Sequence, residues 1–365
     1  MALSVSSVVS THLLIPKTPK SRRFAFNSHK VHHPTNLSLR PCSASLATIP
    51  VSTSFDLHSY STSIIRVIES ELDAALTVHY PENMYGAMRY SVFCSGAKRA
   101  SSIMCIAACE LFGTPRAAAL PTAAALEMVH AASHMHDDLP CMDAAPIRSG
   151  RPSTHARYGV GAALLSGDAL FPLGFAHVAT KTPPELVPRE AVVLVLKEIA
   201  RTVGCTGMAA GQLLDLSGAA AKGEVEVLHV LEKKFGEFAE CSAVCGGILA
   251  GAGEDDQVAL RQYGRTVGVL YELVDDVFME SNGRAGKMRS NASVVRTLGM
   301  ERALELVEQL TNKAKNELQR FGDQYGDRVL PLYSFVDYAV ERGFVVQGWE
   351  EAVAIAPVAS AAASS

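Results

Sequence analysis

Hydrophobic positions along most of the chain recur with the period of an amphipathic helix. Between residues 63 and 76, Ile64, Ile68, Leu72 and Ala75 are three or four residues apart, so they share one face of a helix. The same period predicts further helices over residues 121–136, 191–204, 227–251, 258–278 and 301–321. Alternating, strand-like stretches are scarce, and no unit of about 20 to 50 residues repeats. We therefore expect an all-α fold.

Composition divides the chain into parts. With 48% hydrophobic residues in a chain of 365, residues 56–352 can bury a large core, and we expect them to form one helical domain. The Ala/Ser-rich segment 353–365 is too simple to fold, and we predict a disordered tail there. Charged residues, His, Gly or Pro interrupt every apolar run before the roughly 20 residues that a bilayer requires. We therefore expect a soluble chain with no transmembrane segment.

The N-terminal segment differs in charge from the rest. No acidic residue precedes Asp56, whereas six basic residues and many Ser, Thr and Pro do, a composition typical of a transit peptide. We predict that residues 1–52 are a disordered transit peptide removed near residues 45–55; an ordinary disordered tail is the alternative. The remaining 27 bases and 37 acids leave a net charge of about −10. That charge gives no reason to expect nucleic-acid binding.

A first acidic cluster, HDDLPCMD, ends one of the predicted helices. His130 and Asp137 are seven residues apart and so share a helix face. Pro140 should break the helix and let Asp143 return toward Asp137. Converging carboxylates at a helix end suit Mg²⁺, which takes few protein carboxylates and bridges to substrate phosphates. A solvated acidic helix end is the alternative, but apolar residues are interleaved with these acids.

Six stretches in succession resemble the trans-isoprenyl diphosphate synthases, particularly plant geranylgeranyl diphosphate synthases. They are GAKRASSIMCIAACELFG, EMVHAASHMHDDLPCMD, RSGRPSTHARYG, LLSGDALF, GMAAGQLLDL and LVDDVF. Six ordered motifs are a stronger signal than any single short pattern. The resemblance covers about residues 60 to 350 and implies the isoprenoid synthase fold, a large antiparallel helix bundle around a central cavity.

The resemblance also implies a chemistry. In that family two Asp-rich helices face each other, Mg²⁺ between them binds the diphosphate of an allylic substrate, and the isopentenyl double bond attacks the carbocation left behind. The implied sites are Asp137 and Asp143 for metal, Lys98 and His130 for isopentenyl diphosphate, Arg148 and Lys234 for the allylic diphosphate, and Asp275 and Asp276 as a second acidic motif. Taken singly, each base could equally be a surface charge or a core histidine.

Several positions depart from the family pattern. The replacements are Ser101 and Ser149 for arginines, Phe235 for a threonine, Glu272 for a glutamine, Met279 for the third aspartate of the second motif, and Asn291 for a lysine. Glu280, one turn after Asp276, is a candidate to substitute in part for the lost aspartate. Each missing charge-assisted phosphate contact costs about 1.5 to 3 kcal/mol. Turnover should therefore fall by orders of magnitude.

Two CxxxC motifs, CIAAC and CSAVC, each place two thiols on one helix face. They resemble the signature of the small, non-catalytic subunits of plant heterodimeric geranyl and geranylgeranyl diphosphate synthases. We expect Cys105, Cys109, Cys241 and Cys245 to support a partner-binding surface, directly or through helix packing. Simple small-residue packing is the main alternative. A zinc site would usually need CxxC spacing, and the chain is too large for its eight cysteines to suggest a disulfide framework.

Together these features predict a type II small subunit in the plastid stroma. It would have little activity alone, bind the large catalytic subunit of geranylgeranyl diphosphate synthase, and enhance or redirect its chain elongation. Prenyl diphosphates and Mg²⁺ are the expected ligands. An autonomous homodimeric, Mg²⁺-dependent synthase is the main alternative. A terpene cyclase fits less well because GAKR and RSGRP belong to chain elongation.

Overall fold

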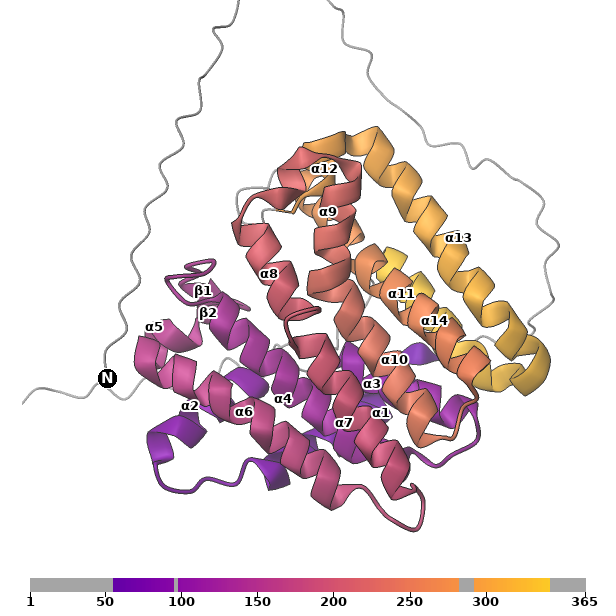
Figure 1. Ribbon diagram of the computed structural model, residues 1–365, viewed down its shortest axis with the longest axis horizontal. Helices are drawn as coiled ribbons and strands as arrows, with labels where there is room; N and C mark the ends of the chain where they lie inside the picture. The colour runs from indigo at the N-terminus through magenta and orange to yellow at the C-terminus, as the bar shows by residue number, and fades with distance from the viewer. Residues whose placement is uncertain (1–54, 95–97, 282–291, 342–365) are drawn as a thin grey trace, which may run out of the picture. The chain divides into compact units, whose positions relative to one another are not determined.

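Helices make up nearly all the regular structure of the computed structural model, which describes residues 55–94, 98–281 and 292–341 (Figure 1). The longer helices are α1 (Leu57–Ala75), α2 (Glu82–Val92), α3 (Ala100–Leu111), α4 (Leu120–Asp137), α6 (Val160–Lys181), α7 (Arg189–Val203), α8 (Met208–Leu216), α9 (Glu224–Leu231), α10 (Glu237–Leu249), α11 (Glu254–Ser281), α13 (Met300–Tyr325) and α14 (Leu330–Glu341). The shorter elements are α5 (Thr154–Tyr158), α12 (Val294–Leu298), the 3₁₀ helices η1 (Arg116–Ala118), η2 (Ala219–Lys222) and η5 (Gly326–Val329), the π-helical turn η3 (Glu232–Gly236), and the strands β1 (Ile147–Arg148) and β2 (Arg151–Pro152). The all-α prediction is confirmed, with one two-stranded hairpin added.

All six helices predicted from periodicity are present. The longest predicted segment, residues 227–251, is a continuous helical run in which η3 separates α9 from α10. The predicted leader and tail lie outside the described residues.

Helical periodicity did not predict α6. The expectation that no apolar run is long enough to cross a bilayer also needs a correction at this helix. By length and composition alone α6 could cross a membrane, although 39% of its most apolar window is buried within the bundle. It packs mainly against α4 and α2. Apolar residues lie nearly all round α6, so no single face stands out in the sequence.

The core is built around α3, α4, α10 and α11, whose facing side chains are mostly buried. Two glycines allow α10 to approach its neighbours closely. A Cβ on Gly246 would lie 2.1 Å from the carbonyl oxygen of Cys105 on α3, and one on Gly264 of α11 would lie 2.6 Å from that of Ala239. Backbone therefore meets backbone on both sides of α10, which fixes the positions of the helices that surround the cavity described below.

Two connections carry site residues. After α4 ends at Asp137, the backbone N–H of Asp143 donates to the carbonyl of Asp137 at 2.9 Å, so the predicted return after Pro140 is confirmed. The hairpin β1–β2 turns through Ser149 (φ 49°) and Gly150 (φ 75°). Positive φ at both central residues is typical of a type I′ turn. This turn holds Arg148 beside the end of α4.

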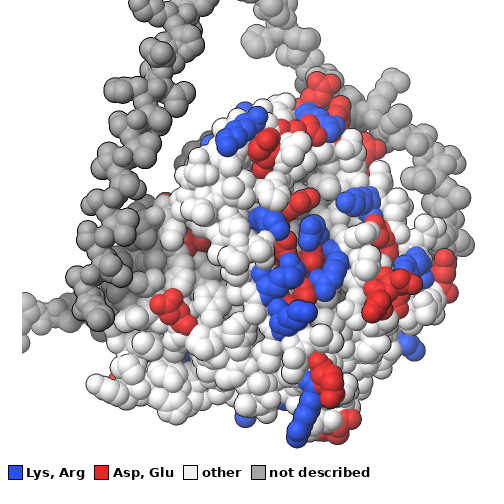
Figure 2. All heavy atoms as spheres, in the orientation of Figure 1, with Lys and Arg blue, Asp and Glu red and all other residues white. Residues whose placement is uncertain are grey.

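An ion cluster joins α7, η3, α10 and α11 on one face of the molecule (Figure 2). Its carboxylates are buried and its bases are partly exposed around them. The members are Glu198, Glu237, Glu240, Arg201, Lys233, Arg261 and Arg265. Burial opposes ionisation of Glu237, but hydrogen bonds from Lys233 and Arg201 outweigh it and hold the pKa of Glu237 below its ordinary value.

Candidate functional site

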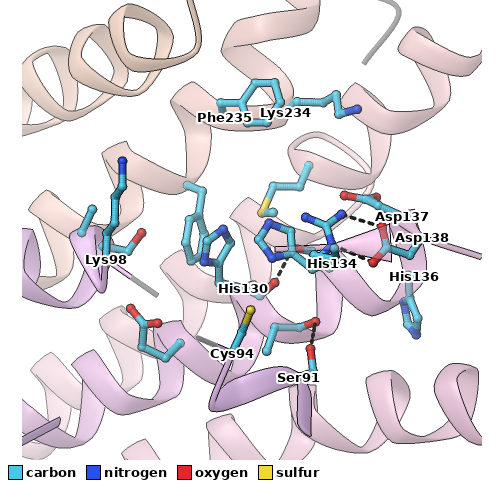
Figure 3. A pocket seen from close by; sticks show the side chains of 18 of the residues that line it. Ser91, Cys94, Lys98, His130, His134, His136, Asp137, Asp138, Lys234 and Phe235 are labelled. Carbon is cyan, nitrogen blue, oxygen red and sulfur yellow. Dashed lines mark hydrogen bonds and ion pairs between the residues drawn. The ribbon is translucent and has the colours of Figure 1, made fainter. Parts of the chain in front are cut away.

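A cavity of about 640 Å³ opens within the bundle, and side chains from α3, α4, α8, η3, α11, α14 and the β1–β2 hairpin line it. Figure 3 shows that Lys98 lies on one side of His130, whereas Asp137 and Asp138 lie on the other. The volume is within the range of small-molecule sites, roughly 300 to 1,000 Å³.

Of the first acidic cluster, Asp137 and Asp138 line the cavity, whereas Asp143 is not part of the described lining. The Asp137 side chain lines the cavity, and within the described part of the chain it has no hydrogen-bond or ion-pair partner. Asp143 accepts a hydrogen bond from Gln212 at 2.9 Å. Burial raises the pKa of Asp137 to about 6, although Lys234 opposes the rise, and burial also raises the pKa of Asp143. Both acids would gain from a nearby cation.

These two acids fit Mg²⁺ better than a transition metal. Among the described residues no group of three or more His, Cys, Asp or Glu could hold a metal ion. Mg²⁺ uses one or two carboxylates and keeps water or phosphate oxygens for the rest of its octahedron. The donor set around Asp137 and Asp143 therefore has the composition of a magnesium site that is completed by substrate.

The two bases predicted to meet an allylic diphosphate are both held by buried acids. Arg148 donates twice to Asp138, at 2.6 and 2.8 Å, and Asp138 is 1% exposed. Lys234 lies on the π-helical turn η3 and donates to Asp215 at 2.7 Å. A π-turn widens a helix locally and is frequent at functional sites. Both bases line the cavity in fixed orientations.

Gln212, Asp138 and Asp215 were not assigned a role from the sequence. Gln212 and Asp215 are three residues apart on α8, within GMAAGQLLDL, so they share a helix face. Their three-residue spacing was the sequence signal that could have identified Gln212 and Asp215 as site residues. Their partners, Asp143 and Lys234, lie 69 and 19 residues away along the chain.

The side predicted to bind isopentenyl diphosphate is aromatic. Lys98 donates to the hydroxyl of Tyr271 at 2.9 Å, and its ammonium lies 5.4 Å and 5.6 Å from the ring centroids of Tyr271 and Tyr338. Burial would lower the pKa of Lys98, but these tyrosines outweigh it and raise the pKa. Lys98 is therefore held as a cation between two rings.

His130 lies in the middle of the cavity wall. Its ring centroid is 4.1 Å from that of His134 and 5.3 Å from that of Phe238. Burial lowers the pKa of His130, which favours the neutral imidazole at neutral pH. A neutral ring can still donate one hydrogen bond into the cavity.

The second acidic motif lies outside the cavity wall. Neither Asp275 nor Asp276 is among the described residues that line the cavity, although Glu272, one turn earlier, is. Asp276 is 2% exposed and accepts hydrogen bonds from the Ser293 hydroxyl at 2.8 and 3.0 Å and from the backbone N–H of Val295 at 2.9 Å. It anchors the start of α12.

Glu280, the candidate replacement for the lost aspartate, also lies away from the cavity. It is 3.7 Å from Arg296 and is not part of the described lining. Partial compensation for Met279 by Glu280 therefore has no support in this geometry. Asn291 lies outside the described residues.

All four CxxxC thiols are fully buried, at 0% exposure, between α3 and α10. The sulfurs of Cys241 and Cys245 are 3.7 Å apart. Burial raises the pKa of Cys109 to about 12 and that of Cys105 well above its ordinary value, so these thiols stay protonated. In this arrangement the cysteines cannot touch a partner directly, so an influence on pairing through helix packing and simple core packing are the two interpretations that remain.

Comparisons with known proteins agree with this fold. A sequence model of the polyprenyl synthetase family matches residues 81–291. Over 316 residues the chain is 52% identical to the chloroplastic small subunit of heterodimeric geranylgeranyl pyrophosphate synthase from Arabidopsis thaliana, covering 86% of this chain and 92% of that one. It is 35% identical to the chloroplastic large subunit 1 from the same plant, covering 79% and 80% of the two chains.

A solved structure of a related enzyme has a similar fold. The crystal structure of an FPP/GFPP synthase from Zymomonas mobilis superimposes with a TM-score of 0.68 at 26% sequence identity, covering 78% of this chain and all of that one. The predicted isoprenoid synthase fold is confirmed.

Proposed function

This chain belongs to the polyprenyl synthetase family, and from that premise we propose that it is the small subunit of a heterodimeric geranylgeranyl diphosphate synthase. It binds a catalytically competent large subunit and enhances or redirects the prenyl-chain elongation that the large subunit performs. Alone it has little or no activity. The chloroplastic relatives support a plastid protein, and we place it in the stroma.

The observation that carries this proposal is that the second acidic motif, Asp275 and Asp276, is not part of the described cavity lining. Elongation needs metal held from two sides of the diphosphate, but here Asp276 is used to anchor α12 and Met279 stands where a third aspartate is expected. The carboxylates in the described cavity lining are Glu127, Asp137 and Asp138 from α4 and its end, and Glu272 from α11. The leaving group would therefore lack half of its charge stabilisation.

Under this proposal the first acidic cluster keeps the ability to bind Mg²⁺ and a diphosphate. Asp137 and Asp143 would hold Mg²⁺, which when bound would neutralise a diphosphate. Asp138 and Asp215 orient Arg148 and Lys234 toward the same region, and burial strengthens their hydrogen bonds to a phosphate. The arrangement can bind a prenyl diphosphate but is poorly equipped to ionise it.

An exposed apolar face supplies a surface for the large subunit. Leu164 and Leu165 on α6 are 42% and 56% exposed, and Val193 and Leu194 on α7 are 63% and 47% exposed. Figure 2 shows little charge on the surface over α6. The first pair lies near the start of α6 and the second near the start of α7, and exposed apolar side chains are a feature of protein interfaces. We propose that this face, named here the α6–α7 face, meets the large subunit.

Turnover by the isolated chain tests the assignment. With two or more phosphate contacts missing at about 1.5 to 3 kcal/mol each, elongation should be at least ~100-fold slower than in a competent homologue. Ser101→Arg combined with Met279→Asp should recover part of the rate. Co-expression with a competent large subunit should change the amount or length of its product. Robust activity of the chain alone would instead favour the autonomous homodimer.

A further inference from the structure

The two sides of the cavity differ in how their charges are used. On the side of Lys98, the ammonium is already bonded to the Tyr271 hydroxyl and lies over the rings of Tyr271 and Tyr338. Tyr271 comes from α11 and Tyr338 from α14. A ligand that needs Lys98 must therefore displace contacts made by two helices. We name this group of three residues the tyrosine clamp.

Positive charge near the tyrosine clamp is also reduced. Arg99 is 4% exposed and donates to Glu127 at 2.9 Å, so a buried acid neutralises this base. Ser101, which also lines the cavity, contributes no charge. Of the two bases named here, Lys98 is then left for a ligand, and the tyrosine clamp already holds it. A diphosphate carries about two to three negative charges, so a single base that is already held would attract it weakly.

The opposite side keeps what a diphosphate needs. Asp137 is a cavity-lining carboxylate without a side-chain partner in the described ranges, ready for a bridging cation. Arg148 and Lys234 line the same side, each oriented by one buried acid through hydrogen bonds of 2.6 to 2.8 Å. Paired bases in fixed orientations can still share their remaining N–H groups with phosphate oxygens.

Apolar side chains form part of the cavity wall. Met104 from α3, Phe238 from α10 and Phe335 from α14 line the cavity, and the His130 ring stacks on Phe238. Hydrocarbon is a better occupant than a second diphosphate for a region with these walls.

We propose that this subunit binds one prenyl diphosphate as a retained ligand and discriminates against isopentenyl diphosphate, with Tyr271 and Tyr338 as the residues that set this specificity. The headgroup lies with Mg²⁺ near Asp137, Arg148 and Lys234, and the prenyl tail extends toward the tyrosine clamp. This proposal rests on the proposed function, because a competent synthase would need both diphosphates. The small subunit would then sense the substrate or product of its partner.

Binding to the full chain tests the proposal without relying on turnover. Geranyl and geranylgeranyl thiolodiphosphates, which resist ionisation, and isopentenyl diphosphate would be titrated with Mg²⁺ by calorimetry. At least one prenyl analogue should bind ten or more times more tightly than isopentenyl diphosphate, and Lys234→Met should weaken it at least tenfold. Equal affinity for the two classes, or no binding of either prenyl analogue, would overturn the proposal.

Two variants test the tyrosine clamp. Tyr271→Phe removes the hydroxyl that accepts from Lys98 but keeps the ring, and it should raise the affinity for isopentenyl diphosphate, relative to the affinity for the prenyl analogues, about 3- to 10-fold. Tyr325→Phe, which removes a hydroxyl from α13 outside the cavity lining, is the matched control and should change neither affinity. An unchanged affinity in Tyr271→Phe would refute the role of the clamp.

Co-purification with the large subunit, measured in parallel, separates this inference from the proposed function. Loss of pairing with intact prenyl binding would count against the small-subunit assignment alone. Intact pairing without prenyl binding would count against the ligand site alone.

Discussion

Asp137 combines burial with the lack of a side-chain partner among the residues described. The raised pKa, about 6 against an ordinary 3.8, means that between these values the folded chain binds more protons than the unfolded chain. The contribution of Asp137 to the free energy of unfolding should therefore fall as pH rises through that window, by at most about 3 kcal/mol. Above pH 6 the ionised carboxylate destabilises the metal-free fold.

Asp137→Asn should relieve this destabilisation. At pH 7 without Mg²⁺ we expect the variant to be about 1 to 3 kcal/mol more stable than the wild type, and at pH 4 the difference should largely vanish. Millimolar Mg²⁺ should stabilise the wild type but not the variant. Urea denaturation at both pH values, with and without Mg²⁺, measures all three effects.

Asp323→Asn, at an exposed position on α13, is the control and should leave both the pH dependence and the Mg²⁺ response unchanged. A stability difference between the wild type and Asp137→Asn that does not grow between pH 4 and pH 7, with no Mg²⁺ response, would contradict the account of Asp137.

The packing of α3 against α10 depends on one glycine. A Cβ on Gly246 would meet the Cys105 carbonyl oxygen at 2.1 Å and the Cys109 nitrogen at 3.0 Å, and backbone atoms cannot move aside as a flexible side chain can. Gly246→Ala should therefore cost about 2 to 4 kcal/mol, despite the better helix propensity of alanine. Chemical denaturation of the purified chain measures the change.

Gly161→Ala is the matched control because Gly161 also lies in a helix, α6, but has no heavy atom within 4 Å of its added Cβ. That variant should be neutral or more stable by up to about 1 kcal/mol. Equal effects of the two substitutions would mean that α3 and α10 can move apart freely.

The four CxxxC cysteines lie in the same helix contact, so we expect them to influence pairing only through the packing of the bundle. Replacing Cys105, Cys109, Cys241 and Cys245 by serine buries four hydroxyls at about 1 to 3 kcal/mol each where they stay unsatisfied. A folded quadruple variant should bind the large subunit ~10²-fold more weakly, as measured by titration.

Asp137→Ala provides the comparison because it changes the cavity rather than the α3–α10 contact, and it should leave pairing unchanged. Undiminished pairing of the folded cysteine variant would reduce the CxxxC motifs to ordinary core packing.

The assembled surface determines where the large subunit can dock. Leu165 is 56% exposed on the α6–α7 face, and a carboxylate placed there would be desolvated in an apolar interface. Leu165→Glu should weaken binding of the large subunit at least ~100-fold without unfolding the chain. Co-purification, followed by titration of the tagged subunits, provides the measurement.

Leu304→Glu is the control on α13, where Leu304 is similarly exposed at 52%. If Leu304→Glu abolishes pairing while Leu165→Glu does not, the interface lies on α13 rather than on the α6–α7 face.

Much of the architecture could be predicted from the sequence because the signals are local. A period of three to four residues specifies which face of a helix is buried, so α1, α4, α7, α10, α11 and α13 were predicted. Pro140 stops α4 beside Asp137 for a steric reason carried by one residue, so the return of Asp143 was predicted too. α6 was missed because its apolar residues lie on several faces.

The partners of the charged groups depended on how the helices pack. Arg148 pairs with Asp138 ten residues away, Lys234 with Asp215 nineteen residues away, and Lys98 with Tyr271 across 173 residues. Likewise, Asp276 belongs to an acidic motif in the sequence but anchors α12 in the fold. The type of a side chain determines which groups it can bind. Distance and burial then select one partner among many candidates. Distance and burial are set only when segments that are far apart in the sequence come together in the fold.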